Sequence, residues 1–245
     1  MDLLSRLEQA SFPGDHALSL YLAAGPALDR RYHHALLKDL KKAAEPELEP
    51  ARKPALHRES LIARRYLDQV SPSGKPLAVF SCRSRGLFEA LSLPEDVRSQ
   101  LYIGERLELA PLREILLRHP PALVVLADKQ KARVFHLVLA EVQEVAELEG
   151  DPVRRHRQGG WSDRRFQRHQ DEQAHWNLKA AAEWVDRYGP AERPLRTIYL
   201  GGPPEARASF KRLLPKRLQQ TVAREFAAPL TISSAELTER IRAAS

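Results

Sequence analysis

The sequence predicts an α/β protein of two domains, the second of them a mixed β-sheet flanked by helices. The 245 residues, 43% of them hydrophobic, are enough to build two cores of about 100–150 residues each. Short apolar runs typical of buried strands alternate with stretches of helical periodicity. The pattern changes at Pro120 and Pro121, which a helix does not continue through, so residues 1–120 and 121–245 are the predicted domains.

The first predicted domain begins with a strand and a helical hairpin. The alternating leucines and tyrosine of ALSLYLAA predict a strand over Ala17–Ala24. Helices are predicted at Asp29–Ala44 and Lys53–Val70. Between them, the two prolines and three glutamates of Glu45–Pro50 break the helix and form an acidic tip. Farther along, Pro76–Cys82 predicts a buried strand, QLYIGERLEL an extended segment and PLREILLRH a short helix.

The second predicted domain starts with a meander of strands that leads into an arginine-rich segment. Ala122–Asp128 and the run KARVFHLVLAEVQEVAELEG predict strands around a charged turn. A helix is predicted from about Arg168, because apolar residues recur at helical spacing until Gly189 and Pro190 stop it. TIYLGG predicts another strand, PPEARASFKRLL a helix, and SSAELTERIRAA a final helix capped by Ser234.

Cysteine content and the N-terminal sequence limit the class of protein. Cys82 is the only cysteine, which excludes an internal disulfide and a multi-cysteine metal site and fits a reducing compartment. The first residues lack the pattern of a signal peptide, and no run of about 18 apolar residues occurs. We therefore expect a cytoplasmic protein with no membrane partner, no cofactor and no bound metal.

The positive charge of the chain gathers in one segment. The formal net charge is +7, and residues 154–169 alone contain six arginines and one aspartate, a net charge of +5. Such a cluster repels itself unless water or a polyanion takes up the charge, so it indicates a binding face. The arginines predicted to hold RNA phosphates are Arg154, Arg155, Arg157, Arg164, Arg165 and Arg168.

Gly159 and Gly160 stand at the centre of this segment. Two consecutive glycines let the backbone adopt torsions closed to other residues and bring its N–H groups against a crowded partner. With the flanking arginines they suit RNA, while taken alone the pair fits an ordinary flexible connection into a helix equally well. We expect Asp151–Asp163 to form a mobile, exposed loop.

The stretch RQGGWSDRRFQRHQDEQ resembles the GGQ loop and following helix of the archaeal and eukaryotic class I peptide-chain release factors, which carry the pattern GGQ-S-x-x-R-F-x-R-x-R. The positions that fall on this pattern in register are Gly159, Gly160, Ser162, Arg165, Phe166 and Arg168. The likeness extends from about Ala122 to the end of the chain. It is greatest to the bacterial branch of the superfamily, relatives of ribosome-rescue peptidyl-tRNA hydrolases in which a GGxS loop replaces GGQ.

The resemblance implies a fold, a site and partners. Residues 1–120 correspond to the N-terminal α/β domain of a release factor, with its helical hairpin, and residues 121–245 to the central domain that carries the loop. The implied partners are the rRNA of the large ribosomal subunit and peptidyl-tRNA, and the implied reaction is ester hydrolysis in ribosome rescue. The catalytic residues that it implies are Gly159, Gly160, Trp161 and Ser162.

Two departures from the family pattern shape this expectation. Trp161 occupies the glutamine position, so the side-chain amide is lost, but its backbone N–H remains for a developing oxyanion. The tip at Glu45–Pro50 is acidic and would be repelled by mRNA phosphates, so reading of the stop codon is not expected. The chain also ends where release factors begin a third domain that recruits a GTPase, so the resemblance names no GTPase partner.

Two other functions stay open at this point. The same loop could occupy the peptidyl-transferase centre of stalled or hibernating ribosomes without any catalysis. The chain could also be a nuclease that acts on tRNA ends, or an RNA-binding adaptor.

Other residues that could carry chemistry have simpler explanations. Ser162, His169 and Asp171 lack the context of a nucleophile elbow. The histidines lack the i, i+4 spacing of a helical metal site. Trp176 and Trp184 could stack on RNA bases, but packing against the N-terminal domain is the expected role.

A second basic cluster lies near the C-terminus. Lys211 and Arg212, followed by Lys216 and Arg217, fit an rRNA contact and a solvated helix face equally well. We include Lys211 and Arg212 among the predicted RNA-binding residues.

Overall fold

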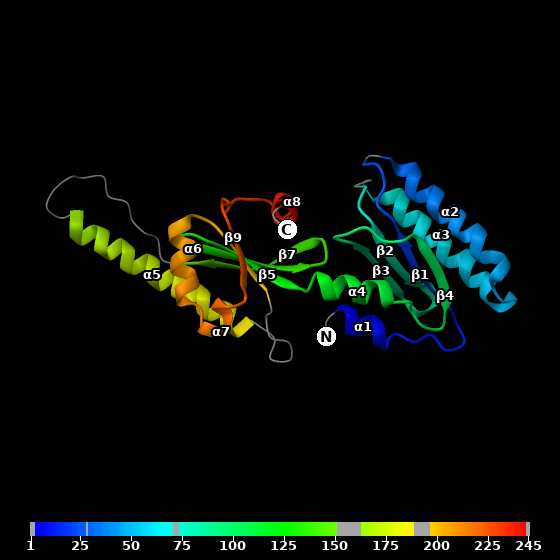
Figure 1. Ribbon diagram of the computed structural model, residues 1–245. Coiled ribbons are helices and arrows are strands. Elements are labelled where there is room, and N and C mark those ends of the chain that lie inside the picture. Colours follow the sequence, from blue (N-terminus) through cyan, green and yellow to red (C-terminus); the bar gives the residue numbers. More distant parts are fainter. Residues whose placement is uncertain (1–2, 28, 71–73, 151–162, 189–196, 244–245) are drawn as a thin grey trace. The chain divides into compact units, whose positions relative to one another are not determined.

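The computed structural model describes residues 3–27, 29–70, 74–150, 163–188 and 197–243, and the side chains at positions 30, 163–171, 242 and 243 lie outside that description. The chain divides into two compact units, Met1–His119 and Pro120–Ser245, and each unit holds one β-sheet with helices packed on it (Figure 1). This confirms the predicted α/β class.

The first unit contains a four-stranded antiparallel sheet with strand order β3-β2-β1-β4. Every residue of the two central strands is buried, because helices or loops cover both faces of the sheet. The elements are α1 (Leu3–Gln9), β1 (Ala17–Leu22), α2 (Arg30–Glu47), η1 (Pro50–Arg52), α3 (Lys53–Gln69), β2 (Leu77–Cys82), η2 (Arg83–Arg85), β3 (Leu87–Ser92), β4 (Gln100–Gly104) and α4 (Ala110–Arg118).

The helical hairpin α2–α3 covers one face of this sheet (Figure 1). Leu37 of α2 and Leu56 of α3 pack against Leu18, Leu20 and neighbouring leucines of β1. On the other face, the fully buried Tyr21 ring meets Phe80 edge-on at 5.8 Å, and its hydroxyl donates to Glu108 O at 2.8 Å. Burial raises the pKa of Tyr21 well above its usual range, so this hydroxyl stays a donor.

The predicted break at Glu45 is wrong, because α2 continues through Pro46 to Glu47. A proline in the last turn of a helix forfeits a single backbone hydrogen bond, which the packed hairpin tolerates. The acidic tip is partly paired. Glu45 accepts from His57 Nε2 at 2.9 Å, and Glu49 lies 3.7 Å from Arg52 Nε.

The second unit contains a five-stranded mixed sheet with strand order β7-β6-β5-β8-β9. The β5, β6 and β7 strands form the predicted antiparallel meander, whereas β5, β8 and β9 run parallel. The elements are β5 (Ala122–Ala127), β6 (Lys131–Val138), β7 (Glu141–Glu149), α5 (Asp163–Tyr188), β8 (Ile198–Gly201), α6 (Pro204–Leu213), α7 (Lys216–Gln219), β9 (Val222–Phe226) and α8 (Ser234–Ala243).

Helices cover both faces of the mixed sheet. Side chains of α5, α6 and α7, among them Leu178, Phe210 and Leu218, pack against one face. Leu237 and Ile241 of α8 join the cluster on the other face. The helix α5 begins at Asp163, five residues earlier than the sequence predicts.

The cap of α8 is Ser233 and not the predicted Ser234. The Ser233 hydroxyl accepts from Glu236 N at 3.2 Å, and the Glu236 carboxylate accepts from Ser233 N at 3.1 Å. This reciprocal pair is a capping box, which requires a glutamate three residues after the cap. The glutamate at 236 therefore selects the first of the two serines.

A buried carboxylate ties α3 to the end of β2. Glu59 is fully buried and accepts from Ser81 Oγ at 2.6 Å, from Arg58 Nε at 2.6 Å and from Arg83 N at 3.2 Å. Because a buried charge is costly unless it is paired, these donors are necessary for the fold. Arg58 extends the network to the loop before β1 by donating to Asp15 Oδ1 at 3.0 Å.

We predict that Asp15 makes the first unit sensitive to acid. A hydrogen bond from Ser84, with others from His16 N and Arg58, lowers the pKa of Asp15 to about 2. A depressed carboxyl pKa contributes stability above the unfolded value, near 4, and loses it as the pH falls toward 2. Asp15→Asn should therefore lower the stability at neutral pH and flatten its decline in acid. Thermal unfolding from pH 6 to pH 2 measures both effects.

Asp39→Asn is the matched control, because Asp39 is exposed and accepts no hydrogen bond from the described residues. Its unfolding curve should follow that of the wild type across the pH range. Parallel curves for all three proteins would contradict the role given to Asp15.

Candidate functional site

Most of the predicted site residues lie outside the described residues. The predicted catalytic set, Gly159, Gly160, Trp161 and Ser162, belongs to residues 151–162, as do Arg154, Arg155 and Arg157. The backbone of Arg164, Arg165 and Arg168 belongs to α5, and their side chains lie outside the description. The described residues show how the two ends of this segment are held.

The incoming end is fixed at Gly150, directly after β7. Gly150 N donates to Gln130 O at 2.8 Å, which joins the end of β7 to the turn between β5 and β6. Lys131 pairs with Glu149. The hydrogen bond to Glu149 is the main reason that the pKa of Lys131 is raised, and the charges of Glu149 and Glu147 raise it further.

That turn is itself held by one carboxylate. Asp128 Oδ1 accepts from Gln130 N and from Lys131 N, both at 2.7 Å, and Asp128 N donates to Lys131 O at 2.9 Å. An aspartate that binds the backbone two and three residues ahead stabilises a tight turn. The Gln130 carbonyl that receives Gly150 is therefore held in place.

The outgoing helix α5 contacts the same place through Asn177. Its side-chain Nδ2 donates to Lys129 O at 3.1 Å. A Cβ built on Gly150 would lie 2.0 Å from Asn177 Cγ, far inside van der Waals contact. A side chain at 150 would therefore displace the Asn177 amide from its place and from its hydrogen bond to Lys129 O. We call the turn 128–131, Gly150 and Asn177 the loop base.

The N-terminal part of α5 extends beyond the sheet (Figure 1). The first described α5 side chain in the core is Ala174, followed by Leu178, Ala181 and Val185. At about 1.5 Å per residue, the helix begins about 16 Å before that contact. The loop base thus lies beside a long helical arm, and Asp163, the first residue of that arm, directly follows residues 151–162 in the sequence.

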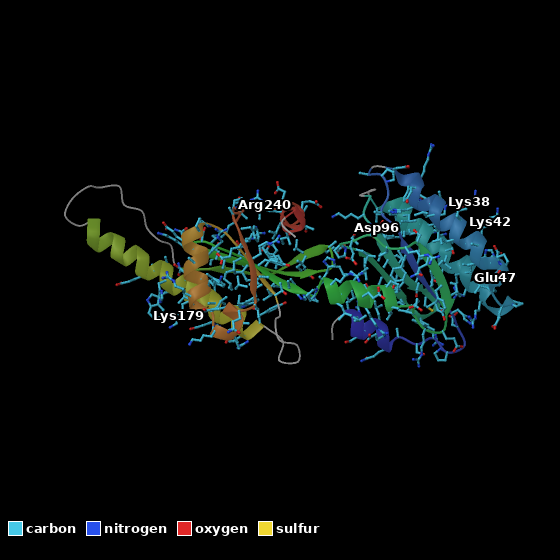
Figure 2. The ribbon with its side chains drawn as sticks, viewed as in Figure 1. Lys38, Lys42, Glu47, Asp96, Lys179 and Arg240 are labelled. Atoms are coloured by element: carbon cyan, nitrogen blue, oxygen red, sulfur yellow. The ribbon has the colours of Figure 1, made fainter. Side chains whose placement is uncertain are left out.

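The two tryptophans of α5 have different surroundings. Trp184 packs against the core of its own unit and stacks on Tyr188, with ring centroids 4.6 Å apart and an interplanar angle of 14°. Trp176 is 61% exposed, and Lys179 Nζ lies 4.9 Å from its ring centroid (Lys179 is labelled in Figure 2). Of the two described tryptophans of α5, Trp176 is the one available for stacking on a base.

The second basic cluster is partly neutralised. Lys211 pairs with Glu225 at 2.9 Å, and Arg217 pairs with Asp186. Arg212 donates to Ser209 Oγ at 3.3 Å and has no acidic partner among the described residues. Of the two residues predicted to bind RNA, Arg212 therefore has the less compensated charge.

The histidines of α2 have ordinary partners. His33 Nε2 lies 2.9 Å from Ala23 O, and His34 Nε2 lies 3.3 Å from Asp68 Oδ1.

Within the described ranges, no group of three histidine, cysteine or acidic side chains could hold a metal ion. Cys82 is buried. No helix in the described part of the chain has the length and apolar character needed to cross a membrane.

A hollow of about 440 Å³ opens at the carboxyl ends of the parallel strands β5, β8 and β9. Asp128, Gly202, Pro203 and Arg240 are among the residues that line it (Arg240 is labelled in Figure 2). Gly202 has φ +125°, and a side chain at this position would place its Cβ 2.1 Å from Ala127 O. The glycine at 202 therefore allows β8 to pack closely against β5. No predicted site residue whose side chain the structure describes is among the lining residues of this hollow.

The model of the bacterial archaeo-eukaryotic release factor family 10 matches residues 108–245. This match spans more than half of the chain, including the whole second unit and the GGWS segment. The chain belongs to this family. The prediction of a bacterial relative of archaeal and eukaryotic release factors is therefore confirmed. The likeness of residues 1–120 to a release-factor N-terminal domain stays a prediction.

Solved structures similar to this family 10 protein include a crystal structure of the archaeal translation termination factor aRF1. It has 20% sequence identity and a TM-score of 0.39, with 99% of this chain and 72% of that one covered. The Pelota protein of Archaeoglobus fulgidus has 13% identity and a TM-score of 0.33, with coverage of 69% and 46%. The Pelota protein of Thermoplasma acidophilum has 16% identity and a TM-score of 0.32, with coverage of 66% and 46%. No curated protein matches the chain.

Sequence reasoning missed the loop base of this family 10 chain. Gly150 and Asn177 lie 27 positions apart, with the predicted loop and the first half of α5 between them. Asn177 is the only asparagine of the chain, and it lies within a helical pattern where asparagine is a poor helix former. That mismatch was the available signal.

We predict that Gly150 and Asn177 are energetically coupled. Gly150→Ala should destabilise the second unit by about 1–3 kcal/mol, because the new methyl group overlaps the Asn177 amide. Asn177→Ala should cost about 1 kcal/mol through the missing hydrogen bond to Lys129 O. The double variant should cost less than the sum of the single changes, because the smaller side chain makes room. Urea unfolding of the four proteins gives the coupling energy, and strictly additive costs would contradict the steric account.

Proposed function

We propose that this family 10 protein is a ribosome-associated, release-factor-like peptidyl-tRNA hydrolase that acts in cytoplasmic ribosome rescue without reading a stop codon. The observation that carries the proposal is the family match over residues 108–245, a range that includes the GGWS segment. The sequence of that segment resembles the GGQ loop of release factors. Its substrate is the ester of peptidyl-tRNA at the peptidyl-transferase centre of the large subunit.

The loop residues have separate roles in this proposal. Gly159 and Gly160 let the backbone pass close to crowded RNA, because neither carries a Cβ. The backbone N–H of Trp161 donates to the oxyanion that develops as water attacks the ester carbonyl. Ser162 keeps the hydroxyl of the GGxS pattern beside it. The ribosome supplies the remaining groups around the ester.

Arginines beside the loop anchor it to RNA. Arg155, Arg157 and Arg165 belong to the set that binds rRNA and tRNA phosphates, and each contact releases counterions from the RNA. Arg212 adds a contact from α6, where its charge lacks an acidic partner among the described residues. The loop base supports this role, because a catalytic segment needs a fixed origin to reach its substrate repeatedly.

The acidic tip of the α2–α3 hairpin supports the proposal that the protein acts without reading a stop codon. Glu47 and Glu49 are exposed at the tip, where carboxylates would face mRNA phosphates unfavourably (Glu47 is labelled in Figure 2).

A second candidate is a non-enzymatic factor that occupies the peptidyl-transferase centre of stalled or hibernating ribosomes. Trp161 favours it, because this large aromatic residue replaces the glutamine of the release-factor pattern. A tryptophan can stack on a base and anchor the loop without any turnover.

Binding to ribosomes should weaken steeply as salt rises. The arginine segment carries a net charge of +5, so its contacts with RNA displace condensed counterions. Co-sedimentation with ribosomes from about 50 to 200 mM salt should show affinity falling by about 10³-fold or more if six phosphates are contacted. An affinity that stays constant over this range would remove the electrostatic premise.

Substitutions at Gly160 and Trp161 separate the two candidates. In a hydrolase that uses the Trp161 backbone N–H, Trp161→Ala should keep most of the activity. Gly160→Ala should lose about 10²-fold or more, because the added Cβ obstructs the approach. In an occupant, Trp161→Ala should cost about 1–3 kcal/mol of ribosome affinity, and neither form should release peptide. Release of labelled peptide and ribosome binding are measured side by side. Strong turnover that neither substitution changes would exclude both candidates.

A further inference from the structure

The outer face of the α2–α3 hairpin carries a set of unpaired cations. Lys41 is half-buried, the other members are exposed, and no member has an acidic partner within the described residues. Figure 2 shows Lys38 and Lys42 on the side of α2 that points away from the sheet. We call this set the hairpin patch, and its members are Arg31, Lys38, Lys41, Lys42, Arg64 and Arg65.

Three of these cations follow one line along α2. Arg31, Lys38 and Lys42 are separated by seven and four residues, the spacing at which a helix returns to the same side. The line covers about 16 Å at about 1.5 Å per residue. It lies opposite the apolar side of α2, where Leu36, Leu37 and Leu40 pack into the core of the first unit.

Two contacts between a histidine and a carboxylate across the hairpin give the register between α2 and α3. His34 pairs with Asp68 at 3.3 Å, and Glu45 pairs with His57 at 2.9 Å. Because the helices are antiparallel, moving four residues forward from His34 and four backward from Asp68 reaches Lys38 and Arg64. Two cations therefore stand at the same level of neighbouring helices.

This arrangement is unfavourable within the protein alone. Like charges at one level repel, and Glu45 and Asp68 are already in contact with histidines across the hairpin, while the exposed Asp39 makes no ion pair with Lys38 or Lys42 in the described part of the chain. A polyanion that lies along the hairpin removes the repulsion and gains the release of its counterions. The positions of the charges thus point to a phosphate-bearing partner.

We propose that the hairpin patch binds the phosphate backbone of double-stranded RNA. The patch contains no aromatic residue, whereas surfaces that bind single strands use exposed rings to stack on bases. The nearest rings of the hairpin are half-buried, with Tyr32 against His33 and Tyr66 against Phe88. Rigid helices with fixed cations suit the regular phosphates of an A-form duplex, which is recognised by shape.

The acidic tip gives the surface a direction. Glu47 and Glu49 lie at one end of the hairpin and repel phosphate, so the duplex is expected along the helices and away from the tip. The choice of RNA among polyanions rests on the proposed function, while the binding of phosphate rests on the hairpin patch alone.

The test uses the full chain and a fluorescein-labelled RNA duplex of about 24 base pairs, followed by fluorescence anisotropy across a salt series. Lys38→Gln/Lys42→Gln should weaken binding about ten-fold at low salt and lower the salt slope by about 2, one for each phosphate that the variant no longer neutralises. The matched control is Arg98→Gln/Arg106→Gln, which removes the same charge from two exposed cations of the first unit that have no acidic partner among the described residues. The control should change affinity less than two-fold.

In the proposed function the loop arginines also bind RNA. The Lys38→Gln/Lys42→Gln variant and its control are therefore measured again in a protein that also carries Arg155→Gln/Arg157→Gln. The weakening caused by Lys38→Gln/Lys42→Gln should persist there, because the two surfaces belong to different units. Unchanged melting temperatures show that the variants fold. Peptide release on ribosomes is measured separately, so a protein that releases no peptide but binds duplex through the patch still supports this proposal.

Three results would overturn the proposal. The first is equal duplex affinity in wild type and the Lys38→Gln/Lys42→Gln variant, or an equal weakening in the control. The second is that a labelled single-stranded RNA of the same length binds as tightly as the duplex, and that its binding depends on Lys38 and Lys42 to the same extent. The third is tighter, patch-dependent binding to vesicles of phosphatidylglycerol and phosphatidylcholine, which would make the partner a lipid surface.

Discussion

The steric fit between Gly150 and Asn177 is the constraint on which the rest of the candidate site depends. It brings together the end of β7, the turn after β5 and the middle of α5, which are distant in sequence. Asp128 fixes the turn and the core holds the backbone of α5 from Ala174 onward, so the side chain of Asn177 is the part of this contact that is free to move. The chain therefore leaves β7 from a backbone position that is held in place at Gly150.

Some charged side chains of this protein are held in ion pairs, whereas others have no partner of opposite charge among the described residues. Arg133 is clamped by Glu144, whose carboxylate raises the pKa of that guanidinium, and Lys211 is paired with Glu225. Such pairs leave little net charge for binding, and each contributes at most about 1 kcal/mol to stability. The hairpin patch carries unpaired charge on one unit, and the arginine segment concentrates positive charge on the other.

The sequence predicted the strongly patterned elements well. The strands β1, β2 and β5 are buried along their whole length, so each appears as a short apolar run. The β3 strand was missed because only half of its surface is covered, and its sequence LFEALS has no clear alternation. The β9 strand was missed because VAREF is short and polar, and it pairs at the edge of the sheet. Such strands owe their structure to the neighbour that pairs with them.

The sequence by itself determined the α/β class, the family through the GGWS pattern, and the concentration of charge between residues 154 and 169. These properties are local, since each depends on residue types at short spacing. Only the tertiary structure decided that Gly150 lies against the Asn177 amide, and that Lys38 and Arg64 stand at the same level. Both depend on the register between distant segments, and that register is set by the packing of whole helices against a sheet.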